Sequence, residues 1–119
     1  MNFNFNEDTP IYIQVASAIE DGILNGIYEE ETQIPSTTEI SVNYKVNPAT
    51  VRKGFDILVS ENIIYKKRGL GMFVCTGAKE NLMNKRKNEF YDNYIVSLID
   101  EAKRLGISIE DVIDMIRGK

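Results

Sequence analysis

The chain has 119 residues, of which 43% are hydrophobic, and a formal net charge of −4. Its length suits one small domain with an appended helical element and leaves no room for a large ligand-binding domain. The chain contains no histidine and one cysteine, so it lacks the soft ligands of zinc and copper sites, although carboxylate sites for hard cations stay open. It also lacks the commonest general base, and a single cysteine cannot form an intrachain disulfide. We therefore expect no cofactor, no structural metal and no catalysis.

No apolar run approaches the roughly 18 to 20 residues needed to cross a bilayer. Residues 1–8, Met-Asn-Phe-Asn-Phe-Asn-Glu-Asp, contain neither a basic segment nor a long apolar one, which argues against a secretory signal. We expect a soluble, cytoplasmic protein.

The charges are unevenly distributed along the chain. Residues 1–32 contain seven acidic side chains and no basic one, whereas residues 33–75 contain six basic and three acidic side chains and hence a local charge of +3. Residues 76–119 carry eight of each sign. Because electrostatic attraction acts over about one Debye length, the +3 segment can attract DNA despite the negative total. An ordinary solvated charge distribution is the alternative explanation.

The first predicted helix has Thr9 as its N-cap and Pro10 at the first helical position, and it ends near Gly26. Tyr12 and Gln14 lie off its apolar face. The apolar residues recur at four-residue spacing: Ile11, Val15, Ile19 and Ile23. This spacing predicts a helix that buries one face in a core, so we expect a scaffolding role for it.

A second helix is predicted from Ser36 to about Tyr44, after a polar connection formed by the three glutamates at 29–31. Ser36-Thr37-Thr38-Glu39 has the pattern of a capping box, in which the serine hydroxyl and the glutamate carboxylate satisfy backbone groups at a helix start. Lys45-Val46 then forms a turn.

A third helix is predicted to begin with Asn47 as its cap and Pro48 at its first position, and to end near Ser60. Asn62 follows where a residue with positive φ is wanted. The predicted buried face consists of Val51, Phe55, Leu58 and Val59. Residues 47–53 bring small, hydroxyl and cationic side chains to the first turns, as in a helix that enters the DNA major groove.

Two short apolar runs at 63–66 and 72–75 flank a segment with two glycines, which predicts a β-hairpin. Directly after a recognition helix, such a hairpin is the wing of a winged helix-turn-helix. Tight turning alone would explain the glycines, but their position beside three cations favours a wing that contacts DNA: Lys66, Lys67 and Arg68. Cys75, at the end of the second run, is expected to be a small buried hydrophobe.

From Lys79 to Leu105 the chain has no proline or glycine, which predicts one long amphipathic helix of about 40 Å if unbroken. Gly106 ends it, and Ser108 begins a capping box for a further short helix. We expect an antiparallel helical hairpin that buries its apolar stripe against a second chain. The predicted dimerisation residues are Phe90, Tyr94, Ile95, Leu98, Leu105, Ile113 and Ile116. Packing on the chain's own winged-helix domain is the alternative.

The predicted fold class is therefore α+β and mostly helical. A winged helix-turn-helix DNA-binding domain occupies residues 1–76, and a two-helix dimerisation hairpin occupies residues 77–119.

Five separated motifs between residues 10 and 75 resemble those of the GntR family of bacterial transcription regulators. They are Pro10-Ile11-Tyr12-Ile13-Gln14, Ile34-Pro35-Ser36, Thr50-Val51-Arg52, Glu61-Asn62-Ile63-Ile64 and Arg68-Gly69-Leu70-Gly71-Met72-Phe73-Val74. Residues 47–50, Asn-Pro-Ala-Thr, and the short helical C-terminus are most similar to the YtrA subfamily. The resemblance implies a dimeric repressor without a larger effector domain, of a kind that often controls genes for ABC transporters.

The resemblance also implies which residues contact DNA. Arg52, Thr50 and Gly69 match the family's contacting arginine, hydroxyl residue and wing-tip glycine. Thr38 stands where most members have an arginine, which removes one strong contact, and Pro48 replaces another arginine common early in the third helix. The predicted DNA-binding residues are Ser36, Thr38, Asn47, Ala49, Thr50, Arg52, Lys53, Arg68, Gly69 and Leu70.

Physical chemistry supports these roles independently. Arg52 can offer a bidentate fork to guanine or phosphate, and Thr50 can donate to phosphate or place its methyl group against thymine. Arg68 is the expected minor-groove side chain, and the N-terminal amides of the second and third helices could hold phosphates. Two alternatives stay open: Arg52 could pair with Asp56, and Ser36 could serve only as a cap.

The predicted function is a homodimeric repressor that places two copies of the third helix in successive major grooves of an inverted-repeat, double-stranded DNA operator. No effector can be named from the sequence. The rival prediction is a winged-helix adaptor that binds proteins without reading DNA sequence; Thr38 and the acidic total charge favour it. An enzyme is a weaker prediction, because no nucleophile–base pair or metal-ligand cluster is visible.

Overall fold

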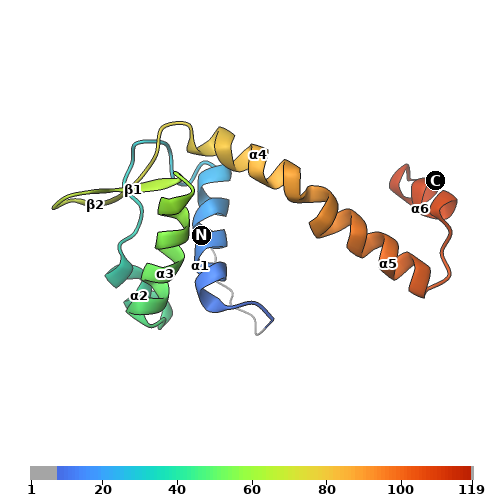
Figure 1. Cartoon of the computed structure of the whole chain (residues 1–119), viewed down its shortest axis with the longest axis horizontal. Coiled ribbons are helices and arrows are strands. Elements are labelled where there is room, and N and C mark those ends of the chain that lie inside the picture. The colour runs from blue at the N-terminus through green and yellow to red at the C-terminus, as the bar shows by residue number, and fades with distance from the viewer. Residues whose placement is uncertain (1–7, 119) are drawn as a thin grey trace. The chain divides into compact units, whose positions relative to one another are not determined.

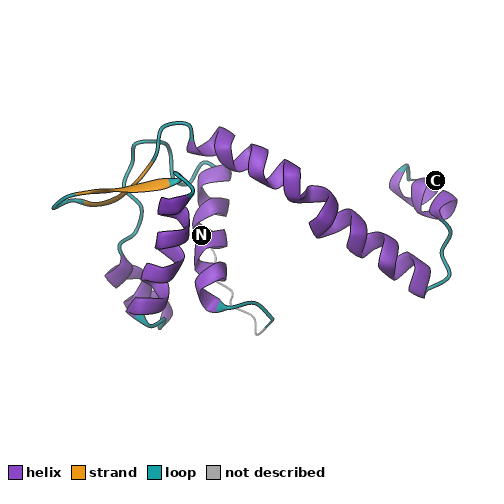
Figure 2. Cartoon of the chain, in the orientation of Figure 1, coloured by secondary structure: helices purple, strands orange, loops and turns teal. Residues whose placement is uncertain are grey.

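Three helices, a two-stranded hairpin and a further series of helices follow one another along residues 8–118, the part of the chain that the computed structural model describes (Figure 1). The elements are α1 (Ile11–Leu24), α2 (Thr37–Tyr44), α3 (Pro48–Ser60), β1 (Ile64–Lys67), β2 (Gly71–Val74), α4 (Ala78–Phe90), the π-helical segment η1 (Tyr91–Ile95), α5 (Val96–Arg104) and α6 (Ile109–Ile116). The fold is α+β and mostly helical, as predicted (Figure 2). Within the described residues, no helix is long and apolar enough to cross a membrane.

Helix α1 starts one residue later than predicted. Pro10, not Thr9, is the N-cap, and no side chain caps the helix. The Thr9 carbonyl instead accepts a hydrogen bond from the Gln14 side chain at 2.6 Å. Of the predicted stripe, Val15, Ile19 and Ile23 are buried, whereas Ile11 is 42% exposed and was assigned to the core wrongly.

The capping box of α2 is confirmed. The Ser36 hydroxyl accepts from the Glu39 amide at 3.0 Å, and the Glu39 carboxylate accepts from the Ser36 amide at 3.2 Å. Lys45 ends the helix with a left-handed φ of 55°. The backbone can therefore turn sharply into α3.

The predicted start and end of α3 are confirmed. The Asn47 side chain accepts from the Ala49 amide at 2.8 Å, Pro48 occupies the first helical position, and Asn62 has a φ of 59°. The buried residues are Val51, Gly54, Phe55 and Leu58. Val59, which was predicted to be buried, is 41% exposed, because it lies to one side of the face that packs on α1 and α2.

The wing is an antiparallel pair of four-residue strands, each displaced by one residue from its predicted position. The backbone of residues 31–34 runs along β2. The Glu31 amide donates to the Val74 carbonyl at 2.8 Å, and the Ile34 amide donates to the Met72 carbonyl at 3.0 Å. The connection between α1 and α2 therefore extends the hairpin.

One hydrophobic core joins α1, α2, α3, the base of the wing and the start of α4. Ala78 and Leu82 are fully buried in it. The first compact unit for this reason ends at Met83, and the second begins at Asn84, later than the division expected after residue 76. Cys75 is partly buried and packs against this core.

The long helix predicted from Lys79 to Leu105 is interrupted. Residues Tyr91–Ile95 form the π-helical segment η1 between α4 and α5. A π turn adds a residue to the helical repeat, so a single α-helical stripe does not continue unchanged through it. Gly106, with a φ of 70°, ends α5, and the Ser108 hydroxyl caps α6 by accepting from the Asp111 amide at 3.1 Å.

Candidate nucleic-acid interface

The N-terminal turn of α3 is exposed but has few free backbone donors. Pro48 has no amide hydrogen, the Ala49 amide donates to the Asn47 side chain, and the Thr50 amide donates to the Asn47 carbonyl at 3.0 Å. This helix end therefore offers few free amides to a phosphate, and phosphate binding by its backbone stays a prediction. What remains for a ligand on this turn is side chains: Ala49 is exposed and Thr50 is partly exposed.

The start of α2 differs from that of α3. Glu39 and Ser36 satisfy each other, but the amides of Thr37 and Thr38 form no hydrogen bond within the described chain. Thr38 is exposed beside them, and the Ser36 hydroxyl is partly exposed. An anion at this end would meet backbone N–H groups and the positive end of the helix dipole.

Arg52 is exposed on α3, and no ion pair joins it to Asp56 among the described residues. The alternative in which an i,i+4 pair holds this arginine is therefore not realised. Its guanidinium keeps all of its donors for a ligand.

Lys53 has a different environment from its neighbour. Its ammonium lies 4.0 Å from the centre of the Tyr12 ring, a cation–π contact that joins α3 to α1. The sequence offered no sign of it, because Tyr12 is distant along the chain and lies off the predicted apolar stripe. A DNA contact by Lys53 stays a prediction, and it would compete with this contact.

The tip of the wing is a tight turn that exposes three predicted site residues. The Leu70 amide donates to the Lys67 carbonyl at 2.9 Å, with Arg68 and Gly69 between them. Gly69 has a φ of 80°, which a larger residue adopts only with strain. Arg68 is exposed, and Leu70 is 64% exposed.

The two lysines of the wing are not equivalent. Lys66 is exposed, whereas the Lys67 ammonium lies 4.2 Å from the centre of the Phe73 ring. Lys67 thus stabilises the hairpin, while Lys66 and Arg68 present their charges to solvent.

Glu31 fastens the wing to the connection before α2, a role that its place in a run of acidic residues did not reveal. Its carboxylate accepts from the Tyr65 hydroxyl at 2.5 Å and from the Thr76 hydroxyl at 2.7 Å and amide at 3.0 Å. These hydrogen bonds, that from Tyr65 foremost, lower the pKa of Glu31, and the same bond raises the pKa of Tyr65 to about 12.

The neighbouring carboxylate of Glu30 caps α4. It accepts from the amides of Gly77 at 2.7 Å and Lys79 at 3.4 Å. Two of the three acidic residues that precede the basic segment are therefore hydrogen-bonded to backbone or hydroxyl donors of the fold.

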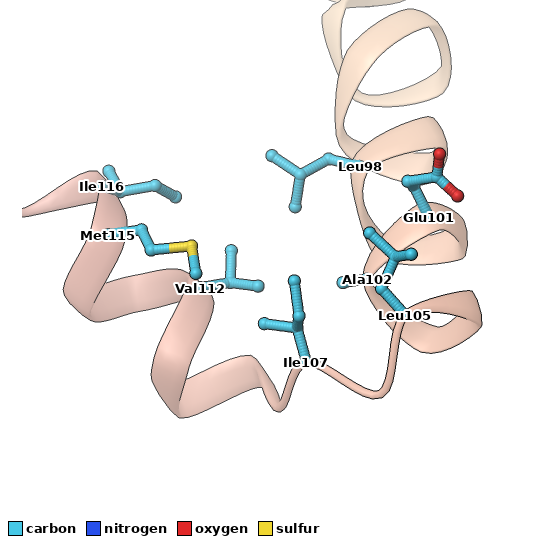
Figure 3. Close-up of a pocket in the computed structure, with 8 residues that line it drawn as sticks. All are labelled: Leu98, Glu101, Ala102, Leu105, Ile107, Val112, Met115 and Ile116. Carbon is cyan, nitrogen blue, oxygen red and sulfur yellow. The ribbon is translucent and has the colours of Figure 1, made fainter.

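The predicted dimerisation residues lie in the second compact unit. Phe90 and Tyr94 are mostly exposed, with ring centres 5.4 Å apart, and Ile95 is partly buried. Apolar side chains of α5 and α6 face one another across a cavity of about 380 Å³ (Figure 3). It is lined by Leu98, Glu101, Ala102, Leu105, Ile107, Val112, Met115 and Ile116. Ile113 is 39% exposed, and Ile116 is 71% exposed.

No group of three or more histidine, cysteine, aspartate or glutamate side chains is arranged to hold a metal ion within residues 8–118. The cysteine has a raised pKa because of burial, which disfavours the reactive thiolate.

Residues 11–74 match the family model described as "Bacterial regulatory proteins, gntR family". The chain is also similar to two proteins of Bacillus subtilis (strain 168). It is 30% identical over 109 residues to the HTH-type transcriptional repressor YtrA, across 92% of this chain and 83% of YtrA. It is 37% identical over 71 residues to the uncharacterized HTH-type transcriptional regulator YurK, across 60% of this chain but only 29% of YurK. The chain thus spans less than a third of YurK and most of YtrA.

Solved structures with similar folds include a GntR-family transcriptional regulator from Bacteroides thetaiotaomicron. It is 41% identical, with a TM-score of 0.70, and the match covers 91% of this chain and 94% of that one. The DNA-binding domain of AraR, solved in complex with its operator ORX1, is 30% identical with a TM-score of 0.55, over 63% of this chain and 92% of that one.

Proposed function

The chain belongs to the GntR family of bacterial regulatory proteins and, within it, to the YtrA subfamily, and on that premise we propose that it is a homodimeric repressor of an inverted-repeat operator. Membership makes it a DNA-binding transcription regulator. The observation that carries the proposal of sequence-specific DNA recognition is the exposed, unpaired guanidinium of Arg52 near Ala49 and Thr50 at the start of α3.

We assign base recognition to α3 and phosphate binding to α2. Arg52 is the side chain for a guanine edge or a phosphate, and Thr50 for a phosphate or a thymine methyl group. The amides of Thr37 and Thr38 are free to bind a phosphate, which compensates in part for the arginine that most family members have at position 38. The wing tip, with Arg68, Gly69 and Leu70, follows the adjoining minor groove. The structure of the similar AraR domain in complex with its operator supports operator binding by this domain.

The second compact unit is the proposed dimer contact, made with a second copy of this chain. Phe90, Tyr94, Leu105 and Ile116 are each more than half exposed, which favours their burial against a second chain, and the likeness to YtrA extends over 92% of the chain, this unit included. Two-fold symmetry would place two α3 helices on half-sites about one helical turn of DNA apart.

Repression is proposed because YtrA, to which 92% of this chain is similar, is named a repressor. Control of transporter genes follows only from the resemblance to that subfamily. Since operator DNA lies on the bacterial chromosome, we place the protein in the cytoplasm. Any effector is unknown.

Selection of bound sequences from a random duplex pool tests this function. We expect a palindrome, bound at nanomolar concentration, with a log–log salt slope that grows by about 0.9 for each phosphate neutralised. Recovery of no preferred sequence would remove the proposal.

A winged-helix adaptor that binds other proteins is the second candidate, favoured by Thr38 in place of the family arginine and by the net charge of −4. It predicts weak DNA association with no sequence preference, so the same selection separates the two functions.

A further inference from the structure

The side chain of Gln33 reaches from the connection between α1 and α2 to the tip of the wing. Its amide nitrogen, Nε2, donates to the Leu70 carbonyl oxygen at 2.6 Å. The backbone continues the contact, since Gln33 forms an antiparallel bridge with Phe73 on β2. The contact joins residues 37 positions apart in the sequence, so it belongs to the tertiary structure and not to the hairpin itself.

Gly71 provides the space for this amide. A Cβ atom at position 71 would lie 2.6 Å from Nε2 of Gln33, closer than Cβ contacts in proteins, and the φ of 126° also disfavours a larger residue. The Gln33 side chain occupies the place that a side chain at position 71 would take.

Both polar groups of the Leu70 backbone are thus fixed. Its amide donates to the Lys67 carbonyl, and its carbonyl accepts from Gln33. Arg68 and Gly69 lie between Lys67 and Leu70, with the arginine side chain exposed. Because a loop that is ordered before binding loses less conformational entropy on binding, these contacts favour any ligand that meets the tip in this conformation.

We propose that Gln33 is a positioning residue for DNA binding, which holds the wing tip in the conformation that presents Arg68 to the minor groove. This inference rests on the proposed function. Gln33 directly precedes the Ile34-Pro35-Ser36 segment that starts α2, so one short stretch sets both the phosphate-facing end of α2 and the tip of the wing.

The test uses the full-length protein and the operator recovered by selection. Gln33→Leu keeps the size of the side chain but removes the donor. Thr32→Val is the matched control, because it removes a neighbouring side-chain hydrogen bond, from the Thr32 hydroxyl to the Glu29 carbonyl at 2.7 Å, that does not reach the wing. Binding, hydroxyl-radical protection of the flanking minor grooves and thermal midpoint are measured for each, alone and combined with Arg68→Ala.

We expect Gln33→Leu to weaken operator binding by roughly two- to tenfold, as for loss of one hydrogen bond. Hydroxyl-radical protection should fall in the flanking minor grooves alone, and the thermal midpoint should match that of the Thr32→Val control. The loss of affinity caused by Gln33→Leu should largely vanish in the Arg68→Ala background, because both changes act on one contact. Unchanged binding, weakening with flank protection intact, or full effect in the Arg68→Ala background would each overturn the positioning role.

The two proposals fail separately. If the wild-type protein selects no preferred sequence, the proposed function is contradicted. If the wild type binds a palindrome and the Gln33→Leu variant binds it equally well, only the positioning role of Gln33 is contradicted.

Discussion

Arg52 and Lys53 are adjacent cations on α3, yet one is free and the other lies against Tyr12. We expect Arg52→Ala to cost about 1 to 3 kcal/mol in operator binding and to relax the preference at one base pair. Lys53→Ala should instead lower folding stability by roughly 0.5 to 1 kcal/mol, through the lost cation–π contact, with a smaller effect on binding. Fluorescence anisotropy and urea denaturation measure the two quantities. Normal operator binding by Arg52→Ala would contradict the role assigned to it.

Tyr65 gives a second prediction, at alkaline pH. Its pKa rises from 10.0 to about 12 on folding, chiefly through the hydrogen bond to Glu31. A group with a raised folded pKa contributes stability that is complete below the unfolded pKa and is lost as pH rises to the folded one. The protein should therefore lose stability between pH 10 and about 12, and Tyr65→Phe should lose less across that range. Urea denaturation at a series of pH values measures this, and equal losses in both proteins would contradict it.

At this scale, the sequence predicted residues whose partners are near in the chain and missed those whose partners are distant. Ser36 and Asn47 were assigned correctly as caps because their acceptor geometry involves the next two or three residues. The partners of Glu31 and Lys53 come from other elements, 34 or more residues away in the case of Glu31, and no local pattern encodes them.

The packing of α3 on α1 depends on a glycine. A Cβ at Gly54 would lie 2.7 Å from the Tyr12 carbonyl oxygen and 3.2 Å from the Val15 side chain, so the two helices would have to move apart. We expect Gly54→Ala to destabilise the protein by about 1 to 3 kcal/mol, although alanine is the better helix former. Chemical denaturation measures it, with Asp56→Ala on the exposed face of α3 as the control. A Gly54→Ala protein as stable as the wild type would show that the close approach is not needed.

Elements were predictable where caps and periodicity agreed. The helix-turn-helix and the wing follow from two local caps, two short apolar runs and glycines. Their order was therefore predicted correctly, and their bounds were correct to within about one residue. The π-helical segment η1 was not predictable, since its residues, Tyr-Asp-Asn-Tyr-Ile, have no distinct pattern, and apolar spacing assumes a constant 3.6-residue repeat. Ile11 and Val59 were misplaced because an apolar stripe does not show which of its members the neighbouring elements cover.

At the scale of the whole molecule, the main expectation is self-association through the second compact unit. Tyr94→Glu would bury a charge in the proposed dimer contact and should raise the dimer dissociation constant by roughly 100-fold or more. Sedimentation equilibrium measures it, with Asn88→Glu, on an exposed position of α4, as the charge-matched control. Loss of the dimer in Tyr94→Glu should lower the affinity for a full operator but leave the affinity for a single half-site unchanged. A wild type that stays monomeric at micromolar concentration, or a Tyr94→Glu protein that associates normally, would contradict the dimer.

The adjacent carboxylates of Glu30 and Glu31 accept hydrogen bonds from different parts of the fold: Glu30 from the start of α4, and Glu31 from Tyr65 and Thr76 at the base of the wing hairpin. Two adjacent residues therefore hold both the wing and the start of α4. We expect any ligand or partner that shifts the start of α4 to strain the hydrogen bonds that hold the wing, and DNA bound to the wing to oppose that shift. Since free-energy linkage is reciprocal, whatever such a ligand subtracts from DNA affinity, the DNA subtracts equally from the affinity for the ligand.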